Sequence, residues 1–198
     1  MALSQAVYEG GLADPVFGSQ SIFRHVMDAF AHPGRTVNLG GMADAPAPLT
    51  EASAAFLAAL ADYDTPVWFE AEAVDANAWL AFHTGAAGTR EASDAAFAVL
   101  APRSRVDGWS QFAIGTSSYP DRSATLLLPV DSLTSGASLR LSGPGIETTE
   151  TLAPIGLPDG FVAAMGANRA LFPLGFDVLL ICGAQAAALP RTTRIMEA

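Results

Sequence analysis

The run Asp177-Val178-Leu179-Leu180-Ile181-Cys182 decides how this chain is expected to fold. A continuous apolar run of this length is typical of a strand that is buried on both faces of a sheet. The following Gly183-Ala184-Gln185 predicts a tight turn, and a final strand is then expected through Pro190 and Ile195. The segment Thr125-Leu126-Leu127-Leu128 has the same apolar character and predicts another buried strand.

Other segments of the sequence predict helices. Residues 19–31 carry apolar side chains at 3.6-residue spacing, with Ser19 or Ser21 as the expected start and Pro33-Gly34 as the stop. Residues 50–62 form a second helical segment behind the cap residue Thr50. The remaining expected elements are a helical turn at 75–80, a helix at 158–169, and strands at 65–69, 97–100 and 138–141. Helices that alternate with short buried strands predict an α/β layer fold with a mixed sheet that finishes in antiparallel strands.

No linker or block of charge divides the chain. One domain is therefore expected over residues 1–198, and it is large enough to bury a core without disulfides or a structural metal. The predicted core residues are Phe23, Val26, Phe30, Phe56, Leu60, Val67, Leu127, Leu139, Leu179 and Ile181.

The charge balance restricts the partners of the chain. The formal net charge is −10, which argues against nucleic acid, because a basic surface is needed to neutralise phosphates. Hydrophobic residues make up 51% of the chain and charged residues only 15%. This apolar surplus indicates a subunit interface, with an alanine-rich genome as the alternative explanation.

Residue types that are rare or missing exclude several chemistries. All ten basic residues are arginine, so the chain cannot form a lysine Schiff base with pyridoxal phosphate or supply the lysine of a Walker A loop. The single cysteine, Cys182, excludes an internal disulfide and fits a reducing compartment. No apolar run is long enough to span a membrane, and the N-terminus lacks the basic head of a signal peptide. We expect no membrane partner and a cytoplasmic location.

The strongest polar cluster is Arg191-Thr192-Thr193-Arg194. Its guanidinium and hydroxyl groups offer hydrogen bonds to a phosphate or a carboxylate of a ligand or partner. An exposed terminal strand with ordinary threonines is the equally open alternative. Because Pro190 lacks an N–H, this stretch is expected at a sheet edge or strand end, where Arg191 stays available for function and contributes little to stability.

Histidines provide the other candidates. His25, Asp28 and His32 share one face of the first predicted helix and present potential metal ligands. A solvated or partner-facing polar stripe that includes Arg24 is favoured over a metal site, and neither a metal nor a cofactor is expected. His83 is either a structural histidine or a residue that opens into a cleft. The residues themselves assign no catalytic role.

Many short segments, taken in order, match a known pattern. They are Asp14-Pro15-Val16, Gln20, Phe23-Arg24, Met27 to Pro33-Gly34, Leu60-Ala61-Asp62, Asp64-Thr65-Pro66-Val67-Trp68, Phe82-His83-Thr84, Gly115-Thr116, Leu139-Arg140-Leu141, Gly143-Pro144-Gly145-Ile146, Phe172-Pro173-Leu174-Gly175, Asp177 and Leu189-Pro190-Arg191-Thr192-Thr193. By their order and spacing, the chain resembles the phosphonate metabolism protein PhnH, which is a component of the bacterial carbon-phosphorus lyase machinery.

The resemblance implies a three-layer α/β/α sandwich with a mixed sheet, similar in topology to pyridoxal-phosphate-dependent transferases but without their cofactor lysine. It also implies a subunit that works with partner subunits G, I and L to transfer the ribose triphosphate of ATP to an alkylphosphonate, with release of adenine. Such a subunit is expected to lack a complete active site of its own and to form a homodimer when made alone. Subunit J is expected as a further partner in the complex.

Two alternatives to the subunit function stay open. One is a stand-alone metal-dependent hydrolase that uses His25, Asp28 and His32. The other is a small anion-binding protein in which Arg191 and Arg194 hold a phosphonate or nucleotide.

Overall fold

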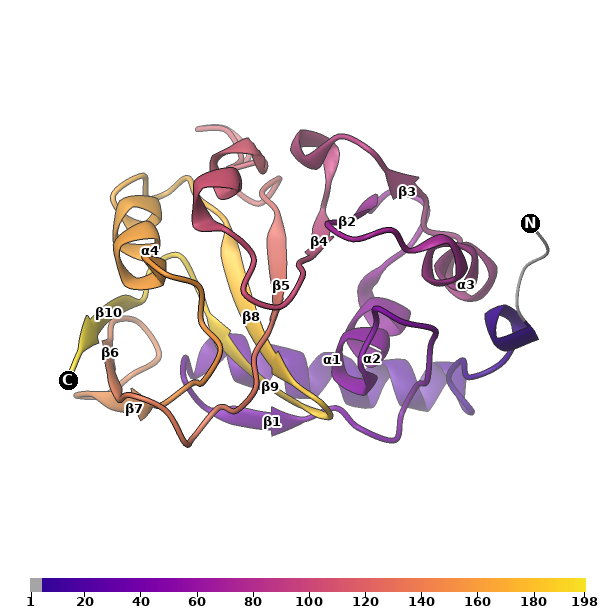
Figure 1. Cartoon of the computed structure of the whole chain (residues 1–198), viewed down its shortest axis with the longest axis horizontal. Coiled ribbons are helices and arrows are strands. Elements are labelled where there is room, and N and C mark those ends of the chain that lie inside the picture. The colour runs from indigo at the N-terminus through magenta and orange to yellow at the C-terminus, as the bar shows by residue number, and fades with distance from the viewer. Residues whose placement is uncertain (1–4) are drawn as a thin grey trace.

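The computed structural model describes residues 5–198 and has a seven-stranded mixed sheet at its centre (Figure 1). Its middle consists of the parallel strands β2 (Val67–Phe69), β4 (Phe97–Val99), β5 (Thr125–Pro129) and β8 (Asp177–Cys182). The flanking strands are β3 (Gly88–Thr89), parallel to β2, and the antiparallel pair β9 (Gln185–Leu189) and β1 (Thr36–Asn38). The order is β1-β9-β8-β5-β4-β2-β3, which confirms the expected mixed sheet of an α/β fold.

The apolar runs that predicted buried strands occupy the centre of this sheet. Leu127 of β5 and Leu179 of β8 are register partners, and both side chains are fully buried. The turn from β8 to β9 contains Gly183, whose backbone is left-handed (φ 57°), a conformation that glycine adopts without steric cost. The predictions of two buried strands and a tight turn are confirmed.

Helices α1 (Pro15–Ala31), α2 (Glu51–Leu60) and α3 (Val74–Thr84) pack on one face of the sheet. Helix α2 begins behind Thr50, as predicted. The Thr50 Oγ1 accepts a hydrogen bond from the Ser53 N–H (3.4 Å), and the Ser53 Oγ accepts one from the Thr50 N–H (2.7 Å). This reciprocal capping box satisfies two backbone donors that the helix itself cannot.

Helix α1 begins at Pro15, so the predicted start at Ser19 or Ser21 is wrong. The Asp14 carboxylate accepts hydrogen bonds from the N–H groups of Val16 (3.1 Å) and Phe17 (3.0 Å). Proline suits the first helical position because its missing N–H would have no partner there. The acidic cap followed by proline is the signal that marks this start.

The opposite face of the sheet carries a mixed layer of one α-helix and a small sheet. Its elements are α4 (Phe161–Arg169) and the antiparallel strands β6 (Leu139–Ser142), β7 (Glu150–Leu152) and β10 (Arg194–Glu197), in the order β10-β6-β7. Short 3₁₀ helices lie at η1 (Gln5–Tyr8), η2 (Ala92–Asp94) and η3 (Val106–Gln111). The third layer is therefore not purely helical, and the likeness to pyridoxal-phosphate-dependent transferases stays a prediction.

The single final strand expected through Pro190 and Ile195 is two strands in different sheets. Strand β9 ends at Leu189 in the large sheet, while Ile195 lies in β10 and pairs with β6. Between them the Thr193 N–H donates to the Pro190 carbonyl oxygen (2.9 Å) and closes a turn. Proline cannot donate to a ladder, so the strand stops there and the chain passes to the small sheet.

Most of the predicted core is confirmed, with α1 as the exception. Phe30 and Leu60 are partly buried, and the other predicted residues apart from Phe23 are buried. Phe23 is 47% exposed, because α1 packs on the sheet through Ile22, Val26 and Ala29. No helix within residues 5–198 is both long and apolar enough to cross a lipid bilayer.

Candidate functional site

The side chain of Arg191 points into the protein. Its Nε and Nη2 donate to the Asp177 carboxylate (3.2 and 2.5 Å), its Nη1 donates to the Pro120 carbonyl oxygen (3.0 Å), and its Nη2 also contacts the Ser123 Oγ. The backbone N–H of Arg191 adds a bond to Asp177 (2.7 Å). Only 12% of the arginine side chain is exposed. The expectation that Arg191 is available at a sheet edge is therefore wrong, because β8 and the loop before β5 already use its donors.

The other three residues of the predicted polar cluster diverge. The Thr192 carbonyl oxygen accepts a hydrogen bond from the Arg169 Nε (3.3 Å). Thr193 is buried, and its Oγ1 has no hydrogen-bond partner among the described residues. Arg194 is exposed at the start of β10. The four neighbouring residues thus do not converge on one ligand, and their role in binding stays a prediction.

His83 lies in an aromatic cluster at the end of α3. Its ring is 4.8 Å from the Trp79 ring and 4.9 Å from the Phe82 ring, centroid to centroid. A Cβ at Gly11 would lie 2.4 Å from the His83 Nδ1, so the N-terminal segment passes directly over the ring. The Nε2 atom is buried and has no hydrogen-bond partner within residues 5–198. The sequence left two roles open for His83, a structural one and one in a cleft, and this packing matches the structural role.

Asp28 pairs with His32, which the helix spacing placed on the same face, and also with Arg35, which the spacing did not indicate. Its carboxylate lies 3.0 Å from the His32 Nδ1 and 3.1 Å from the Arg35 Nη1. His25 is half-buried on the preceding turn, and its Nδ1 lacks a hydrogen-bond partner in the described part of the chain. No group of three potential metal ligands gathers anywhere in residues 5–198.

Helix α1 exposes an apolar face that includes Phe23, which was predicted to lie in the core. Val16 and Phe17 are 73% and 71% exposed, and Met27 and Phe23 are 55% and 47% exposed. Val16, Phe23 and Met27 follow one another at helical spacing, so they form one stripe. Arg24 is exposed beside Phe23, which agrees with the prediction of a partner-facing position but not with a purely polar stripe. We call this surface the α1 face.

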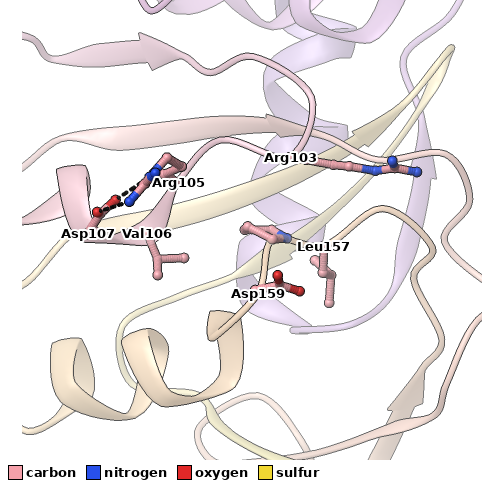
Figure 2. A pocket seen from close by; sticks show the side chains of 7 residues that line it. Arg103, Arg105, Val106, Asp107, Leu157 and Asp159 are labelled. Carbon is pink, nitrogen blue, oxygen red and sulfur yellow. Dashed lines mark hydrogen bonds and ion pairs between the residues drawn. The ribbon is translucent and has the colours of Figure 1, made fainter.

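The structure also forms a pocket that the sequence analysis missed. It has a volume of about 390 Å³ and lies between the segment after β4 and the segment before α4. Figure 2 shows Arg103 and Arg105 on one side, with Leu157 and Asp159 opposite and Val106 nearby. Residues from two segments at least 50 positions apart form this pocket, which is why no local pattern indicated it. We call it the Arg103–Arg105 pocket.

Both arginines of this pocket are paired with exposed carboxylates. The Arg105 Nε and Nη2 donate to Asp107 (3.2 and 2.7 Å), and the Arg103 Nη2 lies 3.3 Å from Asp131. The hydrogen bonds with Arg105 lower the pKa of Asp107, and those with Asp107 raise the pKa of Arg105. Because these side chains are mostly in solvent, such pairs contribute little stability.

Comparison with known proteins identifies the family. Residues 10–196 match the family model described as bacterial phosphonate metabolism protein (PhnH). The chain belongs to the PhnH family. One curated relative, the alpha-D-ribose 1-methylphosphonate 5-triphosphate synthase subunit PhnH of Rhizobium meliloti (strain 1021), is 45% identical over 197 residues, or 98% of each chain. Another, the putative C-P lyase subunit protein HtxG of Stutzerimonas stutzeri, is 34% identical over 177 residues, which cover 89% of this chain and 85% of the relative.

The PhnH match confirms the resemblance drawn from the sequence. Several segments that carried the resemblance have structural tasks in this member of the family. A Cβ at Gly145 would lie 2.1 Å from the Ala31 carbonyl oxygen, so the Gly143-Pro144-Gly145 loop packs closely on the end of α1. Asp177 holds Arg191. These two PhnH segments thus have structural roles in the fold.

Proposed function

We propose that this chain is the PhnH component of a carbon-phosphorus lyase system. It acts with subunits G, I and L in the transfer of the ribose triphosphate of ATP to an alkylphosphonate, with release of adenine, and subunit J is a further partner in the complex. The observation that carries this proposal is the 45% identity, over 98% of both chains, to a subunit named for the synthase of alpha-D-ribose 1-methylphosphonate 5-triphosphate. The single cysteine of the chain, which has no partner for an internal disulfide, supports a place in the reducing cytoplasm.

The exposed α1 face supports a role within an assembly. Large apolar side chains that gather on one surface usually mark a site where another protein binds. Phe23 and Met27 lie beside the charged Arg24, which is a combination typical of protein interfaces. We infer that a neighbouring subunit covers this face, and that a second copy of the chain covers it when the chain is made alone.

Reconstitution tests the subunit function directly. Purified G, I and L subunits, mixed with ATP and methylphosphonate, are expected to release adenine only when this chain is added. The chain alone is expected to release none. Adenine release at the same rate without this chain, or by this chain alone, would contradict the proposal.

Light scattering tests the homodimer and the face that forms it. The unmodified chain is expected to be a dimer at micromolar concentration, and Phe23→Glu together with Met27→Glu is expected to give a monomer, because two carboxylates would be buried without partners. Tyr63→Glu is the matched control, since Tyr63 is 76% exposed and lies outside α1. A monomeric unmodified chain refutes the dimer, and a dimer that survives both α1 substitutions refutes the assignment of the face.

A further inference from the structure

The Arg103–Arg105 pocket lies beyond the carboxyl ends of the parallel strands β4 and β5, since Arg103 follows β4 and pairs with Asp131, which follows β5. The parallel strands have the order β3-β2-β4-β5-β8, so the chain leaves β2 first toward β3 and then crosses to β4 on the other side. Ligands of such sheets bind beyond the carboxyl ends of the strands, at the point where the direction of winding changes. At that point the Glu70 carboxylate after β2 accepts a hydrogen bond from the Ala101 N–H after β4 (2.8 Å). The pocket begins beside it, two residues later at Arg103, and its lining comes from residues 103–107 and 157–159.

Two cations gather at this pocket in a chain that has few. The sequence contains ten basic residues and twenty acidic ones, yet Arg103 and Arg105 line the same cavity. Their carboxylate partners, Asp131 and Asp107, are exposed, and phosphate oxygens accept the same hydrogen bonds from guanidinium groups. A phosphate chain can therefore replace these carboxylates at small cost.

The backbone of Arg103 is held in an unusual conformation. Its φ is 57°, the left-handed region that residues with a Cβ rarely adopt, and Arg103 is the sole non-glycine residue with positive φ in the described chain. Such conformations persist only where the surroundings enforce them, and they concentrate at functional sites. The strained backbone places the Arg103 side chain at the edge of the pocket, where Figure 2 shows it.

The remaining lining suits the rest of a nucleotide. Val106, Leu157 and Pro158 supply an apolar surface, and the Asp159 carboxylate has an acceptor for sugar hydroxyl groups. Hydroxyls that donate to a carboxylate, and apolar contacts under a base, are common in nucleotide sites. The volume of about 390 Å³ lies within the range of small-molecule sites.

We propose that the Arg103–Arg105 pocket binds the polyphosphate chain of a nucleotide. Figure 2 shows the two guanidinium groups extending in opposite directions, and this separation suits an extended polyanion better than a single phosphate. Arg103 and Arg105 release Asp131 and Asp107 and bind phosphate oxygens, while Asp159 accepts hydrogen bonds from the sugar. The choice of a nucleotide rests on the proposed function, because ATP is the ribose triphosphate donor of that reaction.

Calorimetry with the isolated chain tests this site without partner subunits. ATP and inorganic tripolyphosphate, each with EDTA present, are expected to bind saturably, ATP more tightly, while adenosine alone binds weakly. Arg103→Gln and Arg105→Gln are each expected to weaken ATP binding about tenfold or more, since each removes a charge-assisted contact. Arg140→Gln changes the net charge equally but lies exposed on β6, and it is expected to alter binding by less than about twofold.

Two further variants separate a ligand site from ordinary surface charge. Asp107→Asn frees Arg105 from its competing carboxylate and is expected to tighten ATP binding severalfold. Arg103→Gly relieves the left-handed backbone, so it is expected to keep the melting temperature while weakening ATP binding as Arg103→Gln does.

Three results would overturn the proposal: no saturable ATP binding to the unmodified chain, equal losses in Arg140→Gln and Arg105→Gln, or weaker binding in Asp107→Asn. Any of them leaves the subunit function intact if the chain still supports adenine release in the reconstituted mixture. If the unmodified chain binds ATP but the reconstituted mixture releases no more adenine with it than without it, the proposed function is refuted instead.

Discussion

Arg191→Ala is expected to destabilise the protein by about 3–5 kcal/mol, because it leaves a mostly buried carboxylate without its partner. The Asp177 side chain is only 19% exposed and takes hydrogen bonds from the Arg191 Nε, Nη2 and backbone N–H. The Pro120 carbonyl oxygen and Ser123 Oγ lose donors in the same substitution. These losses do not add, since one guanidinium group serves all the acceptors. Arg191→Lys is expected to recover only part of the loss, because one ammonium group cannot reproduce the fork of donors.

Urea unfolding followed by tryptophan fluorescence measures this effect. Trp109 is buried against Phe161 and Phe176, and Phe176 is the residue before Asp177. The emission of Trp109 therefore reports the loss of packing next to the Arg191 network. For a chain of 198 residues the expected loss corresponds to a fall in melting temperature of about 6–20 °C.

Arg194→Ala is the matched control for Arg191→Ala, because it removes an exposed arginine three positions away. Its effect is expected to stay below about 0.5 kcal/mol. A loss under about 1 kcal/mol in Arg191→Ala, or equal losses in the two variants, would show that the internal network does not support the fold. This expectation replaces the sequence-based one, in which Arg191 was to contribute little to stability.

Two further substitutions test the packing of the fold, with thermal and urea unfolding as the measurement. Leu179→Ala is expected to cost about 2–5 kcal/mol, because Leu179 is fully buried in the central strand; a cost under about 1 kcal/mol would contradict that placement. Gly145→Ala is expected to cost clearly more than Gly41→Ala: both glycines are left-handed (φ 83° and 72°), but a Cβ at Gly145 meets the Ala31 carbonyl oxygen at 2.1 Å, whereas one at Gly41 meets nothing within 4 Å. Equal costs would mean that the left-handed backbone alone, and not the contact with the Ala31 carbonyl oxygen, sets the loss of stability in both variants.

The elements with strong local signals could be predicted from the sequence. The apolar runs at β5 and β8 and the cap at Thr50 each combine a pattern with one local physical cause, and the structure confirms all three. Very short strands such as β3 (Gly88–Thr89) have no comparable pattern, because two or three residues cannot display a period. They exist because a neighbouring strand offers backbone partners.

The misplacement of Phe23 has a physical cause in helix geometry. Apolar residues at 22, 23, 26, 27 and 30 define a band wider than one packing surface, so periodicity alone could not choose which edge is buried. The sheet contacts the edge that contains Ile22 and Val26, and Phe23 and Met27 remain outside. Helix α1 thus carries part of the exposed apolar surface that composition indicated.

The candidate site was harder to predict because arginine is the only residue type among the ten basic residues of this chain, so it serves both structural and binding roles. In a protein with both basic residue types, an arginine beside hydroxyls is a useful indication of bidentate anion binding. Here Arg191 serves an internal carboxylate, and Arg103 and Arg105 line an open pocket, although all three are the same residue type. Only their positions distinguish them: Arg191 follows a strand whose neighbour begins with Asp177, whereas the other two follow the carboxyl end of a parallel strand. Because that distinction depends on strand order, a functional arginine in such a chain is identified by topology and not by its neighbours in sequence.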